Sequence, residues 1–227
     1  MTLSARALLD RLVGFPTVSR DSNLDLIDFV EEYLDDYGVK ATRVPNEDGT
    51  KAALYAHVGP EVDGGIVLSG HTDVVPVDGQ AWDTDPFIVT ERQGKLFGRG
   101  TCDMKGFDAL ALSAVPRALE KGIKRPLQIA LSYDEEVGCT GAPPMIDHMV
   151  AMGMPRADTV LVGDVLQAYQ LGQLCDFRKC RRRTRHFGCR FCTALHDIAC
   201  GHDQWRNRTQ YYCERLPFRV RFPHRPG

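Results

Sequence analysis

The stretch from Ile66 to Gly106 constrains the fold more than any other part of this chain. It opens with a short apolar run, residues 66–70, which has the length and composition of a buried β-strand and ends on His71. Side chains alternate along a strand, so His71 and Asp73 are expected to point the same way. The imidazole could bind a metal ion, and the carboxylate could hold the imidazole in one tautomer. The stretch therefore predicts both a sheet and a chemical site at the end of one of its strands.

Two further segments carry the groups that such a site needs. Asp103 lies inside the glycine-rich run 98–106, and the acidic pair Glu135 and Glu136 follows a second apolar run, residues 127–133. The glycines allow the backbone around Asp103 to turn sharply and to pass close to whatever is bound. One histidine and several carboxylates at neighbouring strand ends are the donor set of a hydrolytic dizinc site.

Strands and helices alternate through the first 163 residues. Periodicity and end signals predict helices over residues 4–13, 24–37, 105–120 and 141–152, and strands over residues 39–44, 52–58, 66–70, 87–90, 95–97, 127–132 and 159–162. Pro116 inside the third helix predicts a kink or a break there. The alternation predicts an α/β fold in which helices surround a mainly parallel sheet, with the site at the carboxyl ends of strands.

Charge and cysteine content divide the chain into two parts. It has 227 residues and a net charge of −2, yet residues 165–227 hold 13 of its 28 Lys and Arg, 4 of its 30 Asp and Glu and 6 of its 8 Cys. Such asymmetry indicates two regions with different histories or partners.

The sequence shows no sign of a membrane or secreted protein. No apolar run approaches the ~20 residues that a membrane span needs. Arg6, Asp10 and Arg11 interrupt the N-terminus where a signal peptide would need a continuous apolar core. We therefore expect a cytoplasmic protein without a membrane partner, whose cysteines are free thiols or metal ligands rather than disulfides.

Three motifs together resemble those of one enzyme family. Residues 71–76 (HTDVVP), 98–106 (GRGTCDMKG) and 134–138 (DEEVG) look like the three signatures of the dizinc aminoacylase and carboxypeptidase family, in the same order and at similar spacing. This family includes acetylornithine deacetylase, succinyl-diaminopimelate desuccinylase and glutamate carboxypeptidase, and residues 132–139 most resemble the first of these. The resemblance covers residues 1–164 and implies a zinc-exopeptidase-like fold for that segment.

The resemblance implies roles for the histidine and the first carboxylates. His71 resembles the family's ligand to the first zinc, and Asp73 resembles the residue that orients this imidazole and raises its basicity. Asp103 resembles the carboxylate that bridges both zinc ions, which in the family is followed by a cis peptide, here Asp103–Met104. The alternatives from the residues alone are a structural histidine at a strand end and a helix N-cap at Asp103.

The later carboxylates complete the site that the resemblance implies. Glu135 corresponds to the general base and Glu136 to a ligand of the second zinc. On an extended strand these two neighbours would face opposite ways, and the family resolves this with a turn. Asp164 occupies the position of an acidic ligand to the first zinc, which is usually Glu. The alternative for the glutamate pair is a solvated acidic turn.

The implied reaction is zinc-dependent hydrolysis of the amide bond in a small N-acyl amino acid. Zinc, or cobalt in its place, lowers the pKa of a bridging water towards ~7, and Glu135 takes its proton and passes it to the leaving amine. For an acetylornithine deacetylase the products are acetate and ornithine, a step of arginine biosynthesis. A related deacylase, desuccinylase or carboxypeptidase of the same family is the alternative.

Residues 165–227 break the pattern. They show no sustained periodicity and carry an arginine-rich block at 178–185. We interpret them as a tail that is disordered or translated out of frame, which the coding DNA around codon 164 would test. Four residues have the spacing of a zinc knuckle, namely Cys189, Cys192, His196 and Cys200. A basic zinc- or RNA-binding protein is therefore the rival function, although the tail lacks apolar positions for a small core and nucleic acid is not the expected partner.

The family's catalytic domain continues beyond what this chain matches. Its later segments bring an inserted lid and dimerisation domain, the last zinc-ligating His and an oxyanion-stabilising His, and no matching motif is found here. The second zinc would then have only Asp103 and Glu136 as ligands, and the sheet would be incomplete, with an open edge. We therefore expect a fragment of weak or no activity, without the domain through which the family forms homodimers.

Overall fold

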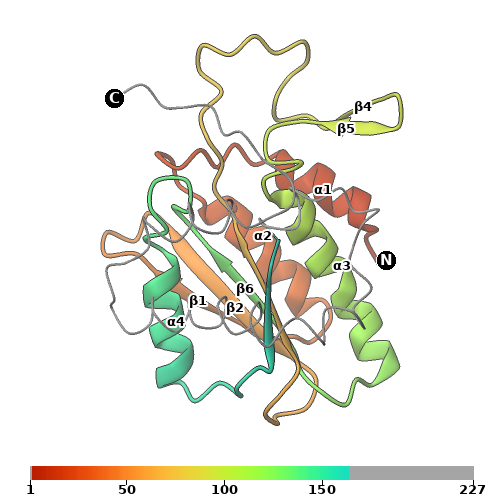
Figure 1. Cartoon of the computed structure of the whole chain (residues 1–227), viewed down its shortest axis with the longest axis vertical. Helices are drawn as coiled ribbons and strands as arrows, with labels where there is room; N and C mark the ends of the chain where they lie inside the picture. Colours follow the sequence, from red (N-terminus) through yellow and green to blue (C-terminus); the bar gives the residue numbers. More distant parts are fainter. Residues whose placement is uncertain (1, 164–227) are drawn as a thin grey trace, which may run out of the picture.

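A computed structural model describes residues 2–163 of the chain (Figure 1). The helices are α1 (Ala5–Val13), α2 (Leu24–Asp35), α3 (Lys105–Lys121) and α4 (Ala142–Ala151). The strands are β1 (Ala41–Pro45), β2 (Ala52–Val58), β3 (Ile66–His71), β4 (Thr90–Arg92), β5 (Lys95–Phe97), β6 (Leu127–Ser132) and β7 (Thr159–Val162). Within residues 2–163, no helix is both long enough and apolar enough to cross a membrane.

The central sheet has the strand order β1-β2-β6-β3-β7. β3 pairs in parallel with both β6 and β7, whereas β2 is antiparallel to both of its neighbours, β1 and β6. Four of the five strands therefore run in one direction, and β2 alone runs against them. The predicted α/β fold around a mainly parallel sheet is confirmed.

Helices cover both faces of this sheet (Figure 1). α1, α2 and α3 lie on one face, where side chains such as Leu8, Ile27 and Leu112 are completely buried against the strands. α4 lies on the opposite face, over a smaller core that includes Tyr55 and Met145. Because helices cover both faces, β6 is buried at every position, which explains its mainly apolar sequence.

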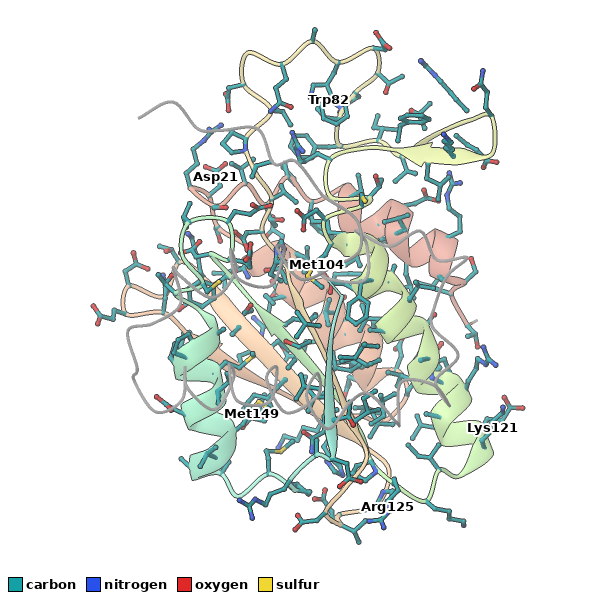
Figure 2. All side chains as sticks on the ribbon, in the orientation of Figure 1. Asp21, Trp82, Met104, Lys121, Arg125 and Met149 are labelled. Atoms are coloured by element: carbon teal, nitrogen blue, oxygen red, sulfur yellow. The ribbon has the colours of Figure 1, made fainter. Side chains whose placement is uncertain are left out.

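Parallel pairing aligns the carboxyl ends of β3 and β6. His71 is in register with Ser132, so the residues that follow the two strands leave the sheet at the same edge. The segment before α3 reaches this edge as well, since the backbone N–H of His71 donates to Sδ of Met104 at 3.3 Å. Figure 2 shows Met104 at this end of the sheet and Lys121 and Arg125 at the other. The fold thus brings three separate segments of the sequence together.

The hairpin that projects beyond the body of the molecule is shifted relative to its prediction (Figure 1). Its first strand is Thr90–Arg92, not residues 87–90, and it pairs with Lys95–Phe97. Gln93 and Gly94 form the connection with φ angles of 52° and 70°. A two-residue turn with both φ angles positive matches the twist of the strands, so the turn sets where the pairing starts.

The prediction at Pro116 was a kink or a break, and the break is wrong, because α3 continues through Pro116 from Lys105 to Lys121. Proline has no N–H, and the carbonyl of Leu112, four residues earlier, therefore lacks its usual helical partner. The hydroxyl of Tyr33 on α2 donates to that carbonyl at 3.3 Å. A contact from another helix thus satisfies the group that the proline leaves unpaired.

Candidate metal centre

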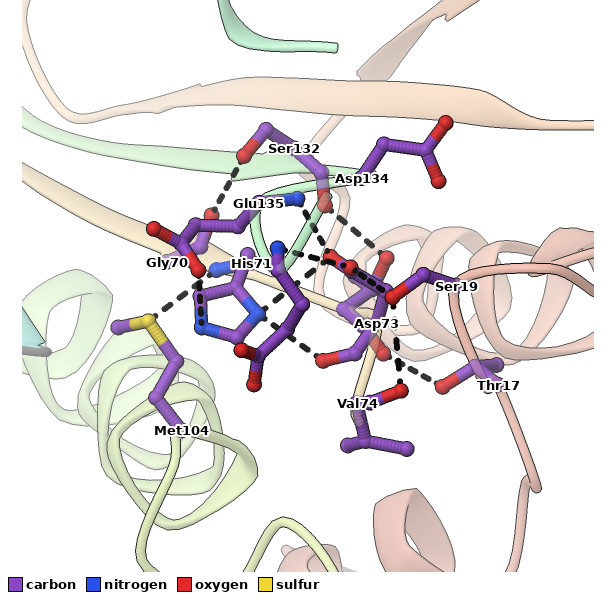
Figure 3. A network of polar contacts seen from close by, with 12 residues as sticks. Thr17, Ser19, Gly70, His71, Asp73, Val74, Met104, Ser132, Asp134 and Glu135 are labelled. Atoms are coloured by element: carbon purple, nitrogen blue, oxygen red, sulfur yellow. Dashed lines mark hydrogen bonds and ion pairs between the residues drawn. The ribbon is translucent and has the colours of Figure 1, made fainter. Parts of the chain in front are cut away.

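The imidazole of His71 is buried at the end of β3 and makes polar contacts through both ring nitrogens (Figure 3). Nδ1 lies 2.9 Å from the backbone carbonyl oxygen of Asp73. A carbonyl can only accept a hydrogen bond, so Nδ1 carries a proton. Nε2 is then the nitrogen that can bind a metal when the ring is neutral. It faces Asp103 Oδ1 at 3.2 Å and Glu135 Oε2 at 3.9 Å.

The carboxylate of Asp73 connects the histidine to the acidic turn after β6. It accepts hydrogen bonds from Ser19 Oγ (2.6 Å) and from the backbone N–H groups of Glu135 (3.1 Å) and Glu136 (3.3 Å). Its Oδ1 lies 3.4 Å from Nδ1 of His71, further than the carbonyl of the same residue. Burial alone would raise the pKa of Asp73, but hydrogen bonds from His71 and Ser19 outweigh it and hold the pKa below its usual range.

The backbone turns sharply after β6, and this turn brings two adjacent glutamates to one side. Asp134 and Cys139 have left-handed φ angles of 57° and 59°, a conformation that costs on the order of 1–3 kcal/mol in a residue other than glycine. The turn interrupts the extended backbone, so Glu135 and Glu136 can both approach His71. The donor atoms of these three residues lie within 4.8 Å of one another, close enough to hold one metal ion.

Asp103 lies on the third segment, just before α3. Its side chain is about half exposed, and Oδ1 is 3.2 Å from Nε2 of His71. This separation is close to the roughly 3.3 Å expected between two donors that each lie ~2.0–2.1 Å from a tetrahedral zinc ion. The peptide bond between Asp103 and Met104 is cis, as predicted.

Negative charge is crowded around the imidazole. Burial, and then the charge of Asp103, raise the pKa of Glu136 to about 7. Burial disfavours the charged form of His71, but hydrogen bonds to Asp103 and Asp73 outweigh it and raise the pKa of the ring to about 11. In the metal-free chain these contacts favour the protonated form of the His71 ring. A divalent cation would take the place of that proton and offset the carboxylate charges, so the donor set fits zinc.

The structure brings together five of the six predicted site residues, namely His71, Asp73, Asp103, Glu135 and Glu136. The sixth, Asp164, lies outside the described residues. The four residues of the rival zinc knuckle also lie outside them.

Two residues of the site carry no recognisable sequence pattern. Ser19 lies in a segment that the sequence predicts as a loop, yet its hydroxyl donates to Asp73. Lys51 lies between a turn and a strand, and its ammonium donates to the carbonyl of Ser19 and to the carboxylate of Asp134. A single serine or lysine in a connecting segment has no spacing that would mark it, so only the folded chain reveals these contacts.

Asp108, in the first turn of α3, is a further buried acid near the site. Its Oδ1 has no hydrogen-bond partner among the described residues, and a Cβ at Gly70 would overlap this oxygen. Burial raises the pKa of Asp108 to about 7, although the positive charges of His71 and Lys105 oppose the shift. The side chain is therefore a neutral acid at low pH and ionises inside the fold near pH 7.

The stability of the metal-free chain should decrease as Asp108 ionises. Its pKa is higher in the folded than in the unfolded chain, so the folded chain binds more protons between about pH 4 and pH 7 and loses this advantage as the pH rises. Asp108→Asn should remove this pH dependence. Between about pH 5 and pH 7, the free energy of unfolding of the variant should therefore rise by about 2 kcal/mol relative to that of the parent. The charged groups that act on Asp108 (His71, Lys105 and Asp73) are common to both chains. Urea unfolding with a chelator measures the difference, and a difference independent of pH would contradict the raised pKa.

The sequence matches known metallohydrolases over most of the described residues. Residues 67–196 match Peptidase family M20/M25/M40, a match that extends past the predicted boundary at Asp164. The acetylornithine deacetylase of Myxococcus xanthus is 40% identical over 164 residues, which cover 70% of this chain and 41% of that protein. The acetylornithine deacetylase of Pasteurella multocida is 37% identical over 160 residues, which cover 67% of this chain and 41% of that protein. The chain thus spans about two fifths of the length of these relatives.

Solved structures share the fold. Human carnosine dipeptidase 1 superposes with a TM-score of 0.61 at 25% identity, over 70% of this chain and 38% of that chain. The M20 family metallo-carboxypeptidase Sso-CP2 of Sulfolobus solfataricus also gives a TM-score of 0.61, at 22% identity, over 70% of this chain and 37% of that chain. The sequence match covers more than half of the chain, and it includes the segments that carry the histidine and the four carboxylates described above. The chain therefore belongs to Peptidase family M20/M25/M40, a family of metal-dependent hydrolases.

Proposed function

We propose that this chain carries the zinc-binding residues of an amide hydrolase that acts on a small N-acyl amino acid. The convergence of one imidazole and two glutamates, whose donor atoms lie within 4.8 Å of one another, is the observation that supports this most directly. The relatives named acetylornithine deacetylase favour N-acetylornithine as the substrate. Because the chain spans about two fifths of their length, the substrate and the activity of the whole protein both belong to the proposal.

Each site residue has a part in this proposal. His71 and Asp164 would hold the first zinc ion, Glu136 would hold the second, and Asp103 would be a ligand to both. Asp73 keeps the imidazole in the tautomer that leaves Nε2 for the metal, and its carboxylate also holds the backbone of the acidic turn. When bound, zinc (or cobalt) supplies the Lewis acidity that makes water a nucleophile near neutral pH and polarises the acyl carbonyl.

Glu135 is the group that moves the proton in this proposal. Its side chain is 33% exposed and its Oε2 faces the ring of His71 at 3.9 Å, so it borders both the metal-binding group and solvent. Glu135 takes a proton from the attacking water and delivers it to the amide nitrogen, whose bond to the acyl carbon breaks. With N-acetylornithine and water as reactants, the products are acetate and ornithine.

Two further points belong to the same proposal. Hydrolysis of another N-acyl amino acid or of a peptide bond by the same residues is the alternative reaction. A cytoplasmic location is also proposed, in which Cys102 and Cys139 would not form disulfides.

Zinc content distinguishes this proposal from zinc binding by the cysteines of residues 165–227. We expect the purified chain to bind zinc and His71→Ala to lose most of it, because the variant lacks the imidazole around which the carboxylates gather. The matched variant with Cys189→Ser and Cys192→Ser should keep its zinc. Metal analysis after dialysis measures both variants. If the double cysteine variant lost its zinc and His71→Ala kept it, the result would contradict the proposal and support the rival function.

A further inference from the structure

Lys51 lies just before β2, and its ammonium is enclosed between two parts of the site. Nζ donates to the backbone carbonyl of Ser19 at 2.5 Å and to Oδ1 of Asp134 at 2.6 Å. The side chains of Lys51 and Asp134 are only 13% and 16% exposed. Salt and water therefore screen this ion pair much less than they screen a surface pair.

Asp134, one of the two acceptors, is fixed through both of its carboxylate oxygens. Lys51 donates to Oδ1, and Oγ1 of Thr140 donates to Oδ2 at 3.4 Å. Asp134 is also the residue whose left-handed φ of 57° begins the turn after β6. The next two residues are Glu135 and Glu136, so a contact that holds Asp134 also holds the turn that presents both glutamates to His71.

Ser19, the other acceptor, connects the ammonium of Lys51 to Asp73. Figure 3 shows its contact with Asp73. The carbonyl of Ser19 accepts from Lys51, and its hydroxyl donates to Oδ2 of Asp73 at 2.6 Å. Asp73 in turn accepts from the backbone N–H groups of the two glutamates. Two paths therefore lead from Lys51 to the same turn, one through the side chain of Asp134 and one through Asp73.

We propose that Lys51 is a positioning residue for the zinc site: its ammonium holds the turn at residues 134–136 in the conformation that binds zinc. The inference rests on the proposed function, because zinc is the ligand that reports it. Within residues 2–163 the ammonium of Lys51 donates to Ser19 and Asp134, and the proposed role acts through these two residues. A residue that stabilised only the fold would change the unfolding temperature and leave the zinc affinity of the folded chain unchanged.

Lys51→Met tests this role because it keeps the aliphatic stem and removes the charge. We expect zinc binding by the folded full chain to weaken about 10–100-fold, the usual effect of removing a partner that orients metal ligands. Arg43→Met is the matched control, because Arg43 on the edge strand β1 forms ion pairs with Asp28 and Glu31 of α2 rather than with the turn. Its zinc affinity should equal that of the parent. Competition with a chelating dye measures affinity, and thermal unfolding of each metal-free variant measures the stability of the fold.

Asp134→Asn tests the other side of the ion pair. If Lys51→Met does not fold, the zinc affinity of Asp134→Asn is compared with that of Arg43→Met instead. Asparagine tolerates a left-handed φ, so the turn keeps an acceptable backbone while the charge is lost. We expect a loss of affinity similar to that of Lys51→Met. The double variant should lose less than the sum of the two single losses, because Lys51 and Asp134 contact each other and act on one turn.

The outcomes separate the two proposals. If Lys51→Met binds zinc as tightly as Arg43→Met, Lys51 has no positioning role, while the zinc site itself stands. If the unmodified chain shows no zinc binding that depends on His71, the proposed function fails and this inference fails with it.

Discussion

On the proposed mechanism, replacing Glu135 with glutamine should lower whatever amide hydrolysis the zinc-loaded chain performs about 10²–10⁴-fold while leaving the bound zinc in place. Glutamine has the shape of glutamate but cannot take a proton from water. The effect should fall on turnover rather than on metal binding, because His71, Asp103 and Glu136 are unchanged. Ornithine release from N-acetylornithine, measured for parent and variant at equal zinc content, gives the ratio.

The neighbouring glutamate supplies the matched control. Burial and the nearby charge of Asp103 raise the pKa of Glu136 to about 7, a penalty that a bound cation would relieve. Glu136→Gln should therefore lose zinc, and hydrolysis should fall because the metal is missing. A Glu135→Gln chain that loses as much zinc as Glu136→Gln would show that Glu135 is a ligand and not the general base.

Gly65→Ala should destabilise the fold of residues 2–163 by roughly 3–5 kcal/mol. Gly65 precedes β3 with a φ of 83°, and a Cβ there would overlap the carbonyl oxygen of Pro126, which precedes β6. That carbonyl accepts from the N–H of Ile66 at 3.1 Å, the contact that begins the parallel pairing of the two strands. Alanine would therefore combine the strain of a positive φ with displacement of this hydrogen bond.

Gly79→Ala separates these two contributions. Gly79 has a similar φ of 71°, but no heavy atom lies within 4 Å of the place where its Cβ would stand. Alanine there should cost about 1–2 kcal/mol, from the backbone strain alone. Urea unfolding of both variants in the presence of a chelator measures the difference, and equal losses would show that the overlap with Pro126 has no effect.

Local patterns were sufficient to predict the strands of the central sheet but not their order. β3 and β6 are short apolar runs, as expected for strands buried between two layers of helices. Their neighbours in the sheet could not be predicted, because β6 pairs with β3 on one side and with β2 on the other across long stretches of sequence. Pairing partners leave no local signal in a single sequence.

The sequence likewise predicted only part of the site. The residues that offer donor atoms were predicted, since His71, Asp103 and the two glutamates belong to recognisable motifs at strand ends. The residues that hold them were not: Ser19 and Lys51 act through single contacts that exist only in the folded chain. Strand alternation alone would place the adjacent glutamates on opposite sides, and only the resemblance predicted a turn there. The left-handed residue Asp134 interrupts the strand before them.

The hydroxyl of Tyr33 has a consequence for how this family varies. A homologue with phenylalanine at position 33 lacks the hydroxyl that donates to the carbonyl of Leu112. With proline at position 116 this buried carbonyl would be unpaired, at a cost of about 1–3 kcal/mol. Such a homologue should therefore avoid proline at position 116, whereas any homologue without that proline is free to dispense with the tyrosine. The two positions should covary, although they lie on different helices and 83 residues apart.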